Sequence, residues 1–557
     1  MNIRILLPIF LLVLHFNIIN AQELNWYQTL KGDCYAREIK ANSKQELVMG
    51  GSLNGCIELS SNESTISRCS NGEYNMLLLK YSGNGEIQWA HSIGGNNEDV
   101  LYGMTVDSDD NIIITGYLIS NSVDFDPSDD AYYINDNSSS SIGYIAKYND
   151  NGEILWGIPL QGSSPVLNTR IQVDEDNYIY TVGMFYHNAD LDPTSNSANL
   201  SSNGDRDIFI AKYSPDGEFM WAKSIGSSTL DRAMGLEVGN GKVIVTGYYT
   251  NTIDINPGAG QEIFNSNGGH DAFILTLNTD GDFLWADTFG NSEDNYVDDL
   301  VIDESGHVIC ITNLVGSYTL SDGSTVSSIG GQDMLVIKYD ELGNILWHTI
   351  IGGNNSWDGI FQITLDDSQN YVVTGGFNGS IQSSNSTLSS LGASDIYIGF
   401  IEPNGGVLEQ YQIASTQGEV GAAITFRDKK IYLYGGYNDS LSLTNNNDNI
   451  ITQSDGNRFI ASFDSFSQAT TLENSQDEIP QISVTPNPTN STIAIRYPVN
   501  MMPTQIHLTD LNGRRLITVQ GTTGETNLNL SNIPEGIYLV QLINENYKIA
   551  RKILKKN

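Results

Sequence analysis

Acidic side chains recur in the loops that follow the tryptophan-bearing segments, and they are the first feature of this sequence that could support chemistry. The four positions are Asp99, Asp231, Asp294 and Asp358. Equivalent loops of a repeat protein lie on one face, where these carboxylates could surround a cation or a polar ligand. Asp is also favoured in turns, because its side chain bonds its own backbone. We consider turns the better explanation and keep the four residues as candidate ligand-face loops.

A second acidic set falls in short polar segments between apolar runs. These segments are Asp107–Asn111, Asp174–Asn177, Asp303–Gly306 and Asp366–Asn370. Their oxygen-bearing side chains are similar to half of a calcium loop, but the bidentate Glu that closes such a loop is missing. We therefore predict tight turns and no cofactor, and calcium is the one metal that these segments leave open.

The other chemistry-bearing residues show no catalytic pattern. The seven histidines are scattered, and none has the HExxH spacing of a zinc site. The sequence also lacks a GxSxG motif, a phosphate-binding loop and a GxGxxG motif after a strand. We predict no catalytic residue, although some of the 66 acidic residues could still pair as in a glycosidase.

The four cysteines do not have the CxxC spacing of a zinc or thioredoxin-like site. Cys56 and Cys69 flank one polar loop and could form a disulfide across it, which an exported protein permits. Cys310 lies in an apolar run and is predicted to be a buried free thiol.

Internal repetition predicts the elements that position these residues. A segment that ends in Trp recurs about every 65 residues, with a run such as Asp207–Tyr213 before it and a Gly-ending apolar run such as Val243–Gly247 earlier still. The Trp-type positions are Trp26, Trp89, Trp156, Trp221, Trp285 and Trp347, and the seventh position holds Glu409. A large residue at a fixed strand position favours packing between repeats over sugar stacking, and Glu409 indicates that one repeat packs differently.

Each repeat alternates apolar and polar residues with period two and contains Gly-bearing turns, so it predicts about four strands. The segment enters partway through a repeat at Trp26 and leaves partway through another at Phe463, which predicts a ring closed by strands from both ends. The repeats resemble bacterial seven-bladed β-propeller repeats and, more distantly, kelch repeats. This resemblance implies an all-β protein with a seven-bladed propeller over residues 22–466, and it implies no activity.

The C-terminal segment has a different pattern. An acidic linker at 467–481 precedes short alternating strands in residues 482–557, which predict a small Ig-like β-sandwich. The motifs in this segment resemble the sorting domain of type IX secretion cargo; they comprise Pro486, Asn487, Pro488, Asp510, Gly513, Gly536, Tyr538, Lys555 and Lys556. The resemblance implies that the type IX secretion machinery of the Bacteroidetes recognises this domain as a partner.

The first residues predict export as well. Residues 1–21 combine Arg4, a short apolar run and a small-residue cleavage point at Ala21 and Gln22, which is typical of a signal peptide. No later apolar run approaches the length of about 20 residues that a membrane-spanning helix needs, so we predict no transmembrane segment. We expect a protein that passes through the periplasm and is secreted or attached to the outer-membrane surface.

The net charge and the predicted fold limit the classes of function that are possible. The net charge of −39 disfavours binding to nucleic acid or to an anionic membrane. The leading hypothesis is a non-catalytic platform that binds an extracellular glycan or protein. The alternative is a secreted polysaccharide hydrolase or lyase with carboxylates in the propeller channel, and a purely structural surface component is a third possibility.

Overall fold

The computed structural model describes residues 24–556 except for several short gaps. These gaps are 61–64, 136–140, 195, 355–356, 384–386, 414–417, 438–440, 445–448, 453–457, 465–482, 486–490, 497–502, 504, 510–513, 523 and 545–546. The chain divides into two compact parts, Met1–Phe466 and Ser467–Asn557. We call them the large domain and the C-terminal domain. Every regular element in the described residues is a β-strand, so the protein is all-β.

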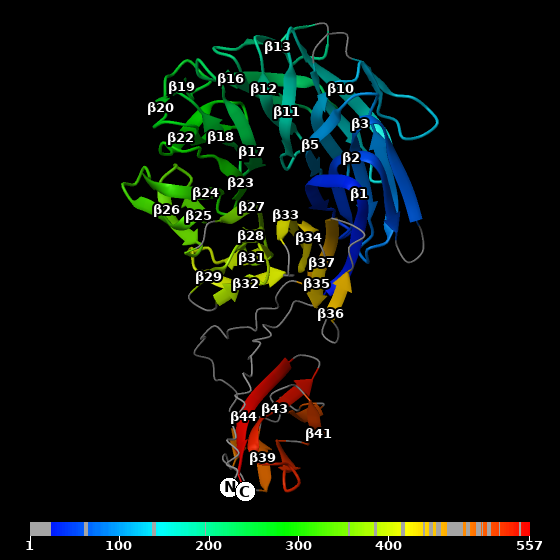
Figure 1. Ribbon diagram of the computed structural model, residues 1–557, viewed down its shortest axis with the longest axis vertical. Coiled ribbons are helices and arrows are strands. Elements are labelled where there is room, and N and C mark those ends of the chain that lie inside the picture. Colours follow the sequence, from blue (N-terminus) through cyan, green and yellow to red (C-terminus); the bar gives the residue numbers. More distant parts are fainter. Residues whose placement is uncertain are drawn as a thin grey trace, which may run out of the picture. The chain divides into compact units, whose positions relative to one another are not determined.

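The large domain is built from antiparallel strands that pair in groups of four (Figure 1). Within each group the strands run from the innermost to the outermost. One group contains β5 (Asp99–Val106), β6 (Ile112–Leu118), β9 (Ile142–Tyr148) and β10 (Ile154–Gly162). The group after it contains β11 (Val166–Val173), β12 (Ile179–Phe185), β15 (Asp207–Tyr213) and β16 (Phe219–Ile225). The next group is β17 (Arg232–Gly239), β18 (Lys242–Tyr249), β21 (Asp271–Asn278) and β22 (Phe283–Phe289).

The same order continues along the chain. The following groups are β23 (Val297–Ile302), β24 (Val308–Thr319), β25 (Thr325–Tyr339) and β26 (Ile345–Ile351), and then β27 (Asp358–Leu365), β28 (Tyr371–Phe377), β31 (Asp395–Ile401) and β32 (Val407–Ile413). Short hairpins extend the outer side; they are β7 (Ser122–Asp124) with β8 (Tyr133–Asn135), β13 (Asn188–Asp190) with β14 (Asn199–Ser201), β19 (Thr252–Asp254) with β20 (Ile263–Asn265), β29 (Ser380–Gln382) with β30 (Thr387–Ser389), and β35 (Leu441–Thr444) with β36 (Asn449–Thr452).

Both ends of the large domain share one sheet. Its order is β33 (Glu419–Arg427), β34 (Lys430–Tyr437), β37 (Arg458–Asp464), β1 (Leu24–Ala41), β2 (Leu47–Ser60), β3 (Thr65–Tyr81) and β4 (Ile87–Ile93). The first half of β1 pairs with β37, with Trp26 opposite Ser462, and its second half pairs with β2, with Ile39 opposite Met49. The N-terminal strand therefore provides the outermost strand of the last group and the innermost strand of the first.

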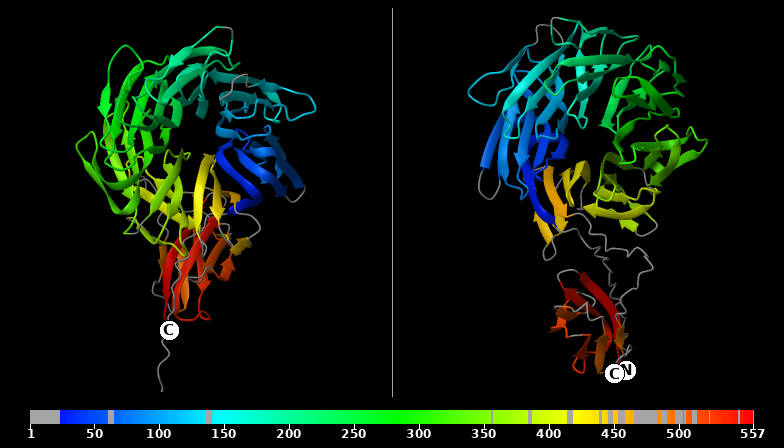
Figure 2. Two further views of the ribbon diagram at one scale, coloured as in Figure 1. Left: turned by 45° about the horizontal axis from the view of Figure 1, so that its top comes forward. Right: turned by 180° about the vertical axis from the view of Figure 1, so that it is seen from behind.

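Hydrophobic cores lie between successive sheets. In one of them, Val182 and Ile210 from one sheet pack with Val245 and Leu275 from the next, and all four are fully buried. Because both faces of each sheet are covered by neighbouring sheets, the middle strands are apolar almost throughout; β12, for example, is buried along its whole length. Figure 2 shows the sheets arranged in a ring.

Each tryptophan of the repeat packs on the turn of the following sheet. Trp221 lies against Gly281 in the turn between β21 and β22, and its indole N–H donates to the Thr279 carbonyl at 3.2 Å. Gly281 has a φ of +81°, a conformation that a side chain would strain. The other pairs are Trp26 with Gly85, Trp89 with Gly152, Trp156 with Gly217, Trp285 with Gly343 and Trp347 with Gly405.

A buried lysine reinforces several of these contacts. Lys212 is 8% exposed, and its ammonium donates to the same Thr279 carbonyl at 3.2 Å. Lys80 and Trp89 likewise both donate to the Asp150 carbonyl. One turn carbonyl thus accepts hydrogen bonds from two side chains of the preceding sheet.

The position of Glu409 explains why it is not a tryptophan. The sheet that follows β32 takes its third strand from β37 and its outer strand from β1, which come from opposite ends of the large domain. No hairpin turn joins them, so there is no turn glycine for a Trp to cover. In place of a turn, the Asn25 side chain of β1 donates a hydrogen bond to the Asp464 carboxylate of β37 at 2.9 Å.

The C-terminal domain consists of two antiparallel sheets. One contains β38 (Ser483–Thr485), β39 (Thr492–Arg496) and β42 (Glu525–Asn529), and the other contains β41 (Arg515–Val519), β40 (Gln505–Thr509), β43 (Gly536–Asn544) and β44 (Tyr547–Lys555). Ile493 and Leu528 from the first sheet share one buried core with Leu508, Val540 and Ile553 from the second. The two sheets therefore pack face to face.

The tryptophan contacts predict where the large domain is sensitive to substitution. Trp285 is 8% exposed, and we expect Trp285→Ala to lower the free energy of unfolding by about 3–5 kcal/mol. Gly343→Ala should also destabilise, because its Cβ would lie 2.6 Å from the Trp285 ring. Glu409→Ala is the matched control and should change stability little. Chemical denaturation measures all three, and equal effects of Trp285→Ala and Glu409→Ala would contradict this interpretation.

Candidate functional site in the central channel

The innermost strand of each sheet faces the centre of the ring. These strands contact one another in the order β1, β5, β11, β17, β23, β27 and β33, and β33 contacts β1. They enclose a cavity of about 190 Å³. At this cavity, side chains from sheets far apart in the sequence converge.

A register shift in these strands sets which side chains face the cavity. Each inner strand slips by one residue against its neighbour, as between Ala36 and Glu38 in β1 and between Val297 and Asp299 in β23. Such bulges re-aim the side chains that follow them. Two positions of these strands line the cavity. The first directly follows the shift and is occupied by Glu38, Arg170, Asp299 and Gln362. The second lies two residues further on and is occupied by Lys40, Gln172, Glu237, Thr364 and Thr425.

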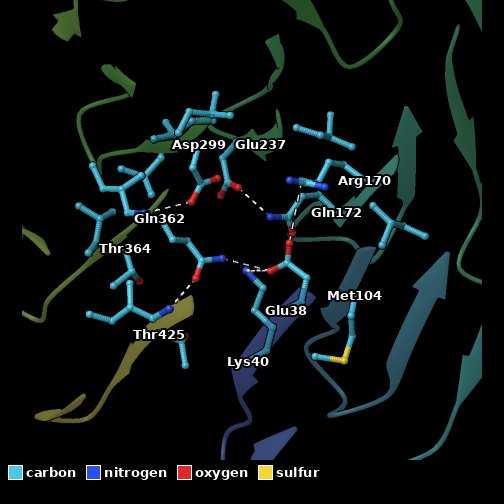
Figure 3. Close-up of a pocket in the computed structure, with 18 residues that line it drawn as sticks. Glu38, Lys40, Met104, Arg170, Gln172, Glu237, Asp299, Gln362, Thr364 and Thr425 are labelled. Atoms are coloured by element: carbon cyan, nitrogen blue, oxygen red, sulfur yellow. Dashed lines mark hydrogen bonds and ion pairs between the residues drawn. The ribbon is translucent and has the colours of Figure 1, made fainter. Parts of the chain in front are cut away.

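Charged and amide side chains in the cavity form ion pairs and hydrogen bonds with one another (Figure 3). The Glu38 carboxylate lies 4.0 Å from both the Arg170 guanidinium and the Lys40 ammonium, and it accepts a hydrogen bond from Gln362 at 3.3 Å. Gln172 donates to Glu237 at 2.7 Å. The network therefore links β1, β11, β17 and β27 through side chains alone.

Backbone groups complete the network. The Ile363 N–H donates to the Asp299 carboxylate at 3.1 Å, and the Ile424 N–H donates to the Gln362 side-chain oxygen at 2.5 Å. Each of these contacts joins two neighbouring inner strands. The polar side chains therefore hold the strands together around the cavity.

Burial controls the protonation of these groups. It raises the pKa of Glu237 to about 7, against the attraction of Lys40, and the nearby Asp299 acts in the same direction. Burial also raises the pKa of Asp299 to about 6, together with the charge of Glu38. Lys40 loses hydration on burial, yet the surrounding carboxylates raise its pKa. The cavity thus holds two carboxyl groups that change protonation near neutral pH beside a lasting positive charge.

The chemistry open to this site is limited by its size. Pockets that hold drug-sized ligands measure about 300–1,000 Å³, and this cavity is smaller. None of the described residues that line it is a histidine. Its volume suits water or a small polar molecule better than a chain of sugars.

The acidic loop residues suggested by the sequence do not face this channel as free carboxylates. Asp99, Asp231 and Asp358 are fully buried, and each carboxylate accepts hydrogen bonds from backbone N–H groups of its own loop. Asp99, for example, accepts from Gly95 of its own loop at 2.7 Å and from Ser120, in the loop after β6, at 3.0 Å. Burial raises the pKa of Asp231 and of Asp358 to about 6. Their contacts hold the loops that lead into β5, β17 and β27.

Asp294 lies differently from the other three. Its side chain is 64% exposed and lies 3.1 Å from the His270 ring. The structural equivalent of Asp231 is the next residue, Asn295, which is 1% exposed. The Asn295 N–H donates to the His270 carbonyl just as the Asp231 N–H donates to Arg206. The sequence pattern predicts Asp294 at this loop position, whereas the structure places Asn295 there.

The second acidic set lies in tight turns. Asp107 accepts hydrogen bonds from the backbone of Asp109 and Asn111 within its own turn, and Asp303 does the same for Ser305 and His307. Asp107 also pairs with the buried Lys147 at 2.9 Å. No three His, Cys, Asp or Glu side chains among the described residues lie close enough to hold a metal ion.

The cysteines separate into a pair and two single thiols. Cys56 and Cys69 are opposite one another on β2 and β3 and are joined by a disulfide. Cys34 and Cys310 are buried free thiols, and burial raises the pKa of both; the pKa of Cys34 rises to about 12. These two thiols are therefore unreactive at neutral pH.

Only part of the C-terminal motif set lies in the described residues. Gly536 and Tyr538 lie on β43, where the Tyr538 hydroxyl donates to the Pro534 carbonyl at 2.9 Å, and Lys555 ends β44 and is 4% exposed. Lys556 follows it and is exposed. The other expected residues lie outside the described part of the chain; they are Ala21, Gln22, Pro486, Asn487, Pro488, Asp510 and Gly513.

Comparison with known proteins decides the nature of the C-terminal domain. Residues 483–556 match the family model described as the secretion system C-terminal sorting domain. This segment is a type IX sorting domain. The prediction of a type IX signal is therefore confirmed, and the chain is a secreted or cell-surface protein that engages the secretion machinery. Within the described residues we find no helix with the length and apolar character to cross a membrane.

Other similar proteins share little sequence identity with this chain. An uncharacterized WD repeat-containing protein of Acanthamoeba polyphaga mimivirus is 23% identical over 363 residues, which are 54% of this chain and 26% of that protein. The chain thus spans about a quarter of that relative. Two solved structures are also similar: the WD40 domain of Neurospora crassa Pan2 (9% identity, TM-score 0.29, 64% of this chain and 93% of that one) and PorZ of Porphyromonas gingivalis (10% identity, TM-score 0.18, 95% and 100%).

Sequence analysis did not find the channel residues. The signal available was the charge of residues such as Glu38, Arg170 and Asp299, and it was weak because their strands contain other polar residues as well. It could not show that they converge, because the register shift decides which side of the strand each one faces.

The titration of Glu237 predicts how stability depends on pH. Its pKa is about 7 in the folded chain and 4.5 ordinarily, so the folded state binds more protons between these values. The free energy of unfolding should therefore fall as pH rises from about 4.5 to about 7. Glu237→Gln should remove about 1–3 kcal/mol of that fall.

Denaturation at several pH values measures this effect. Asp216→Asn, at an exposed turn, is the matched control and should leave the profile unchanged. If Glu237→Gln also left it unchanged, the carboxyl group would not be buried as described.

Proposed function

We propose that this chain is a type IX cargo whose large domain is a seven-bladed β-propeller that works as a non-catalytic binding platform outside the cell. Its partner is an extracellular glycan or protein, and the C-terminal domain is an Ig-like sandwich that directs export. The single observation that carries the proposal is the match of residues 483–556 to the sorting domain.

The blade number is supported by the pairing of strands in groups of four and by the shared sheet of β1 and β37. The Trp–Gly contacts add to this support, because they repeat from one group to the next. A rigid ring of this kind suits a platform, since loops on a fixed scaffold carry binding residues without disturbing the core.

The alternative hydrolase has one observation in its favour. Glu38, Glu237 and Asp299 do line the channel, and two of them have a raised pKa, as a general acid requires. Against it, the cavity of about 190 Å³ is small for a chain of sugars, and Glu38 lies beside Arg170 and Lys40 and accepts a hydrogen bond from Gln362. We therefore favour binding over catalysis.

Deletion of residues 483–556 tests the export step. In a host with a type IX system, we expect the full chain in the medium or on the surface and the truncated chain inside the cell. Immunoblots of the separated fractions give the readout, and a host without the translocon is the control. Equal export of the truncated chain would rule out the role of this domain.

Incubation with insoluble polysaccharides tests the absence of catalysis. We expect the full chain to release no reducing ends over background, because its channel is small for a chain of sugars. Glu237→Gln should behave in the same way. Release that the Glu237→Gln substitution abolishes would establish the hydrolase and refute the platform.

A further inference from the structure

Three outward hairpins of the large domain are built on one plan. In β7–β8, the Asp124 carboxylate accepts from the backbone of Asp126 at 3.1 Å and of Tyr132 at 2.8 Å. Asp190 in β13–β14 and Asp254 in β19–β20 accept from the equivalent backbone groups. Because the backbone is held in the same way, Tyr133, Asn199 and Ile263 occupy equivalent positions at the start of the second strand.

The first of these hairpins differs from the other two in its aromatic side chains. Tyr133 is 57% exposed. Tyr132, just before it, occupies the position of Ala198 and Glu262 in the other hairpins. Two adjacent tyrosines therefore stand where the neighbouring repeats have no aromatic residue.

Tyr132 is fixed against β10 and shapes a pocket beside Tyr133. Its hydroxyl donates to the Gly157 carbonyl at 3.0 Å and accepts from the Gly157 N–H at 3.0 Å. A side chain at position 157 would crowd this ring, because a Cβ there would lie 3.3 Å from it and 3.0 Å from Ile134. The equivalent residues of the next two outer strands, Ala222 and Ala286, have a side chain.

The pocket measures about 410 Å³ and lies between β8 and β10. Tyr133 and Pro159 give it apolar surface, and the amide of Gln161 gives it a donor and an acceptor. The Asn135 amide adds a donor, while its oxygen accepts a hydrogen bond from Ser122 at 2.7 Å. None of the described residues that line it carries an acidic or basic side chain. Its volume lies within the range of small-molecule binding sites.

These features match one class of ligand. An exposed tyrosine ring offers a flat apolar face, and side-chain amides pair with hydroxyl groups. The net charge of −39 repels polyanions, so an uncharged ligand is favoured over an acidic one. We infer that the pocket at Tyr133 binds one sugar ring of a neutral polysaccharide, with the ring stacked on Tyr133. The inference rests on the proposed binding function and names its ligand class.

Depletion of the full chain from solution by insoluble polysaccharides tests the inference. The panel contains neutral polymers (cellulose, chitin, β-1,3-glucan and starch granules) and acidic ones (cross-linked alginate and pectate). We expect depletion by at least one neutral polymer and about tenfold weaker binding for Tyr133→Ala. Tyr133→Trp should retain binding, because the aromatic face is kept.

Ile263→Ala is the matched control, since it removes an exposed side chain at the equivalent position of another hairpin. It should bind as the unchanged chain does. Binding to the neutral polymer should also change little between low and high salt, because no charge pair is formed.

The outcomes separate this inference from the proposed function. Depletion that Tyr133→Ala does not weaken would overturn the pocket and leave the platform in place. Depletion by acidic polymers alone would overturn the neutral-glycan assignment in favour of an acidic glycan. Depletion by none of the panel would also overturn it and point to a protein partner. Release of reducing ends would instead overturn the proposed function itself.

Discussion

The packing of each tryptophan on the turn of the next sheet is the contact on which the ring depends. The turn requires a glycine with positive φ, such as Gly281, and the missing side chain leaves room for the indole. The indole N–H and, in several repeats, a buried lysine then donate to the same turn carbonyl. A buried ammonium is costly unless it is fully bonded, so these lysines stabilise only the correct arrangement of neighbouring sheets. The repeat thus encodes the relation between two sheets as well as the sheet itself.

Where the ring closes, this contact cannot form, and the sequence changes accordingly. The outer strand that would follow β37 across a hairpin comes instead from β1. The preceding sheet has Glu409 in place of Trp, because no turn covers that position. In this way a single departure from the repeat marks the point where the two ends meet. Closure through backbone hydrogen bonds leaves no unpaired strand edge at the junction.

The sequence predicts the strands, the turns and the packing role of the tryptophans because these follow from local patterns. Period-two alternation and Gly-bearing turns are visible within one repeat, and Trp26 to Trp347 are visible by comparing repeats. The candidate site is different. Whether Glu38 or its neighbour faces the channel depends on a one-residue shift in β1, and such a shift leaves no mark in composition. The same limit applies at Asp294, which has the residue type of the acidic set, whereas its neighbour Asn295 takes the buried position.

The contrast between channel and rim bears on where the proposed binding function would have its specificity. Inside the channel, Glu38, Arg170 and Gln362 each contact side chains from other sheets, so a change at one of them disturbs several strands. At the rim, the three hairpins keep one backbone through Asp124, Asp190 and Asp254, while the exposed residue beside it varies from Tyr to Asn to Ile. A scaffold that holds the backbone fixed and frees one side chain can vary its ligand without loss of stability. The physical constraints therefore favour recognition at the outer edge of the ring and a structural role for the charges at its centre.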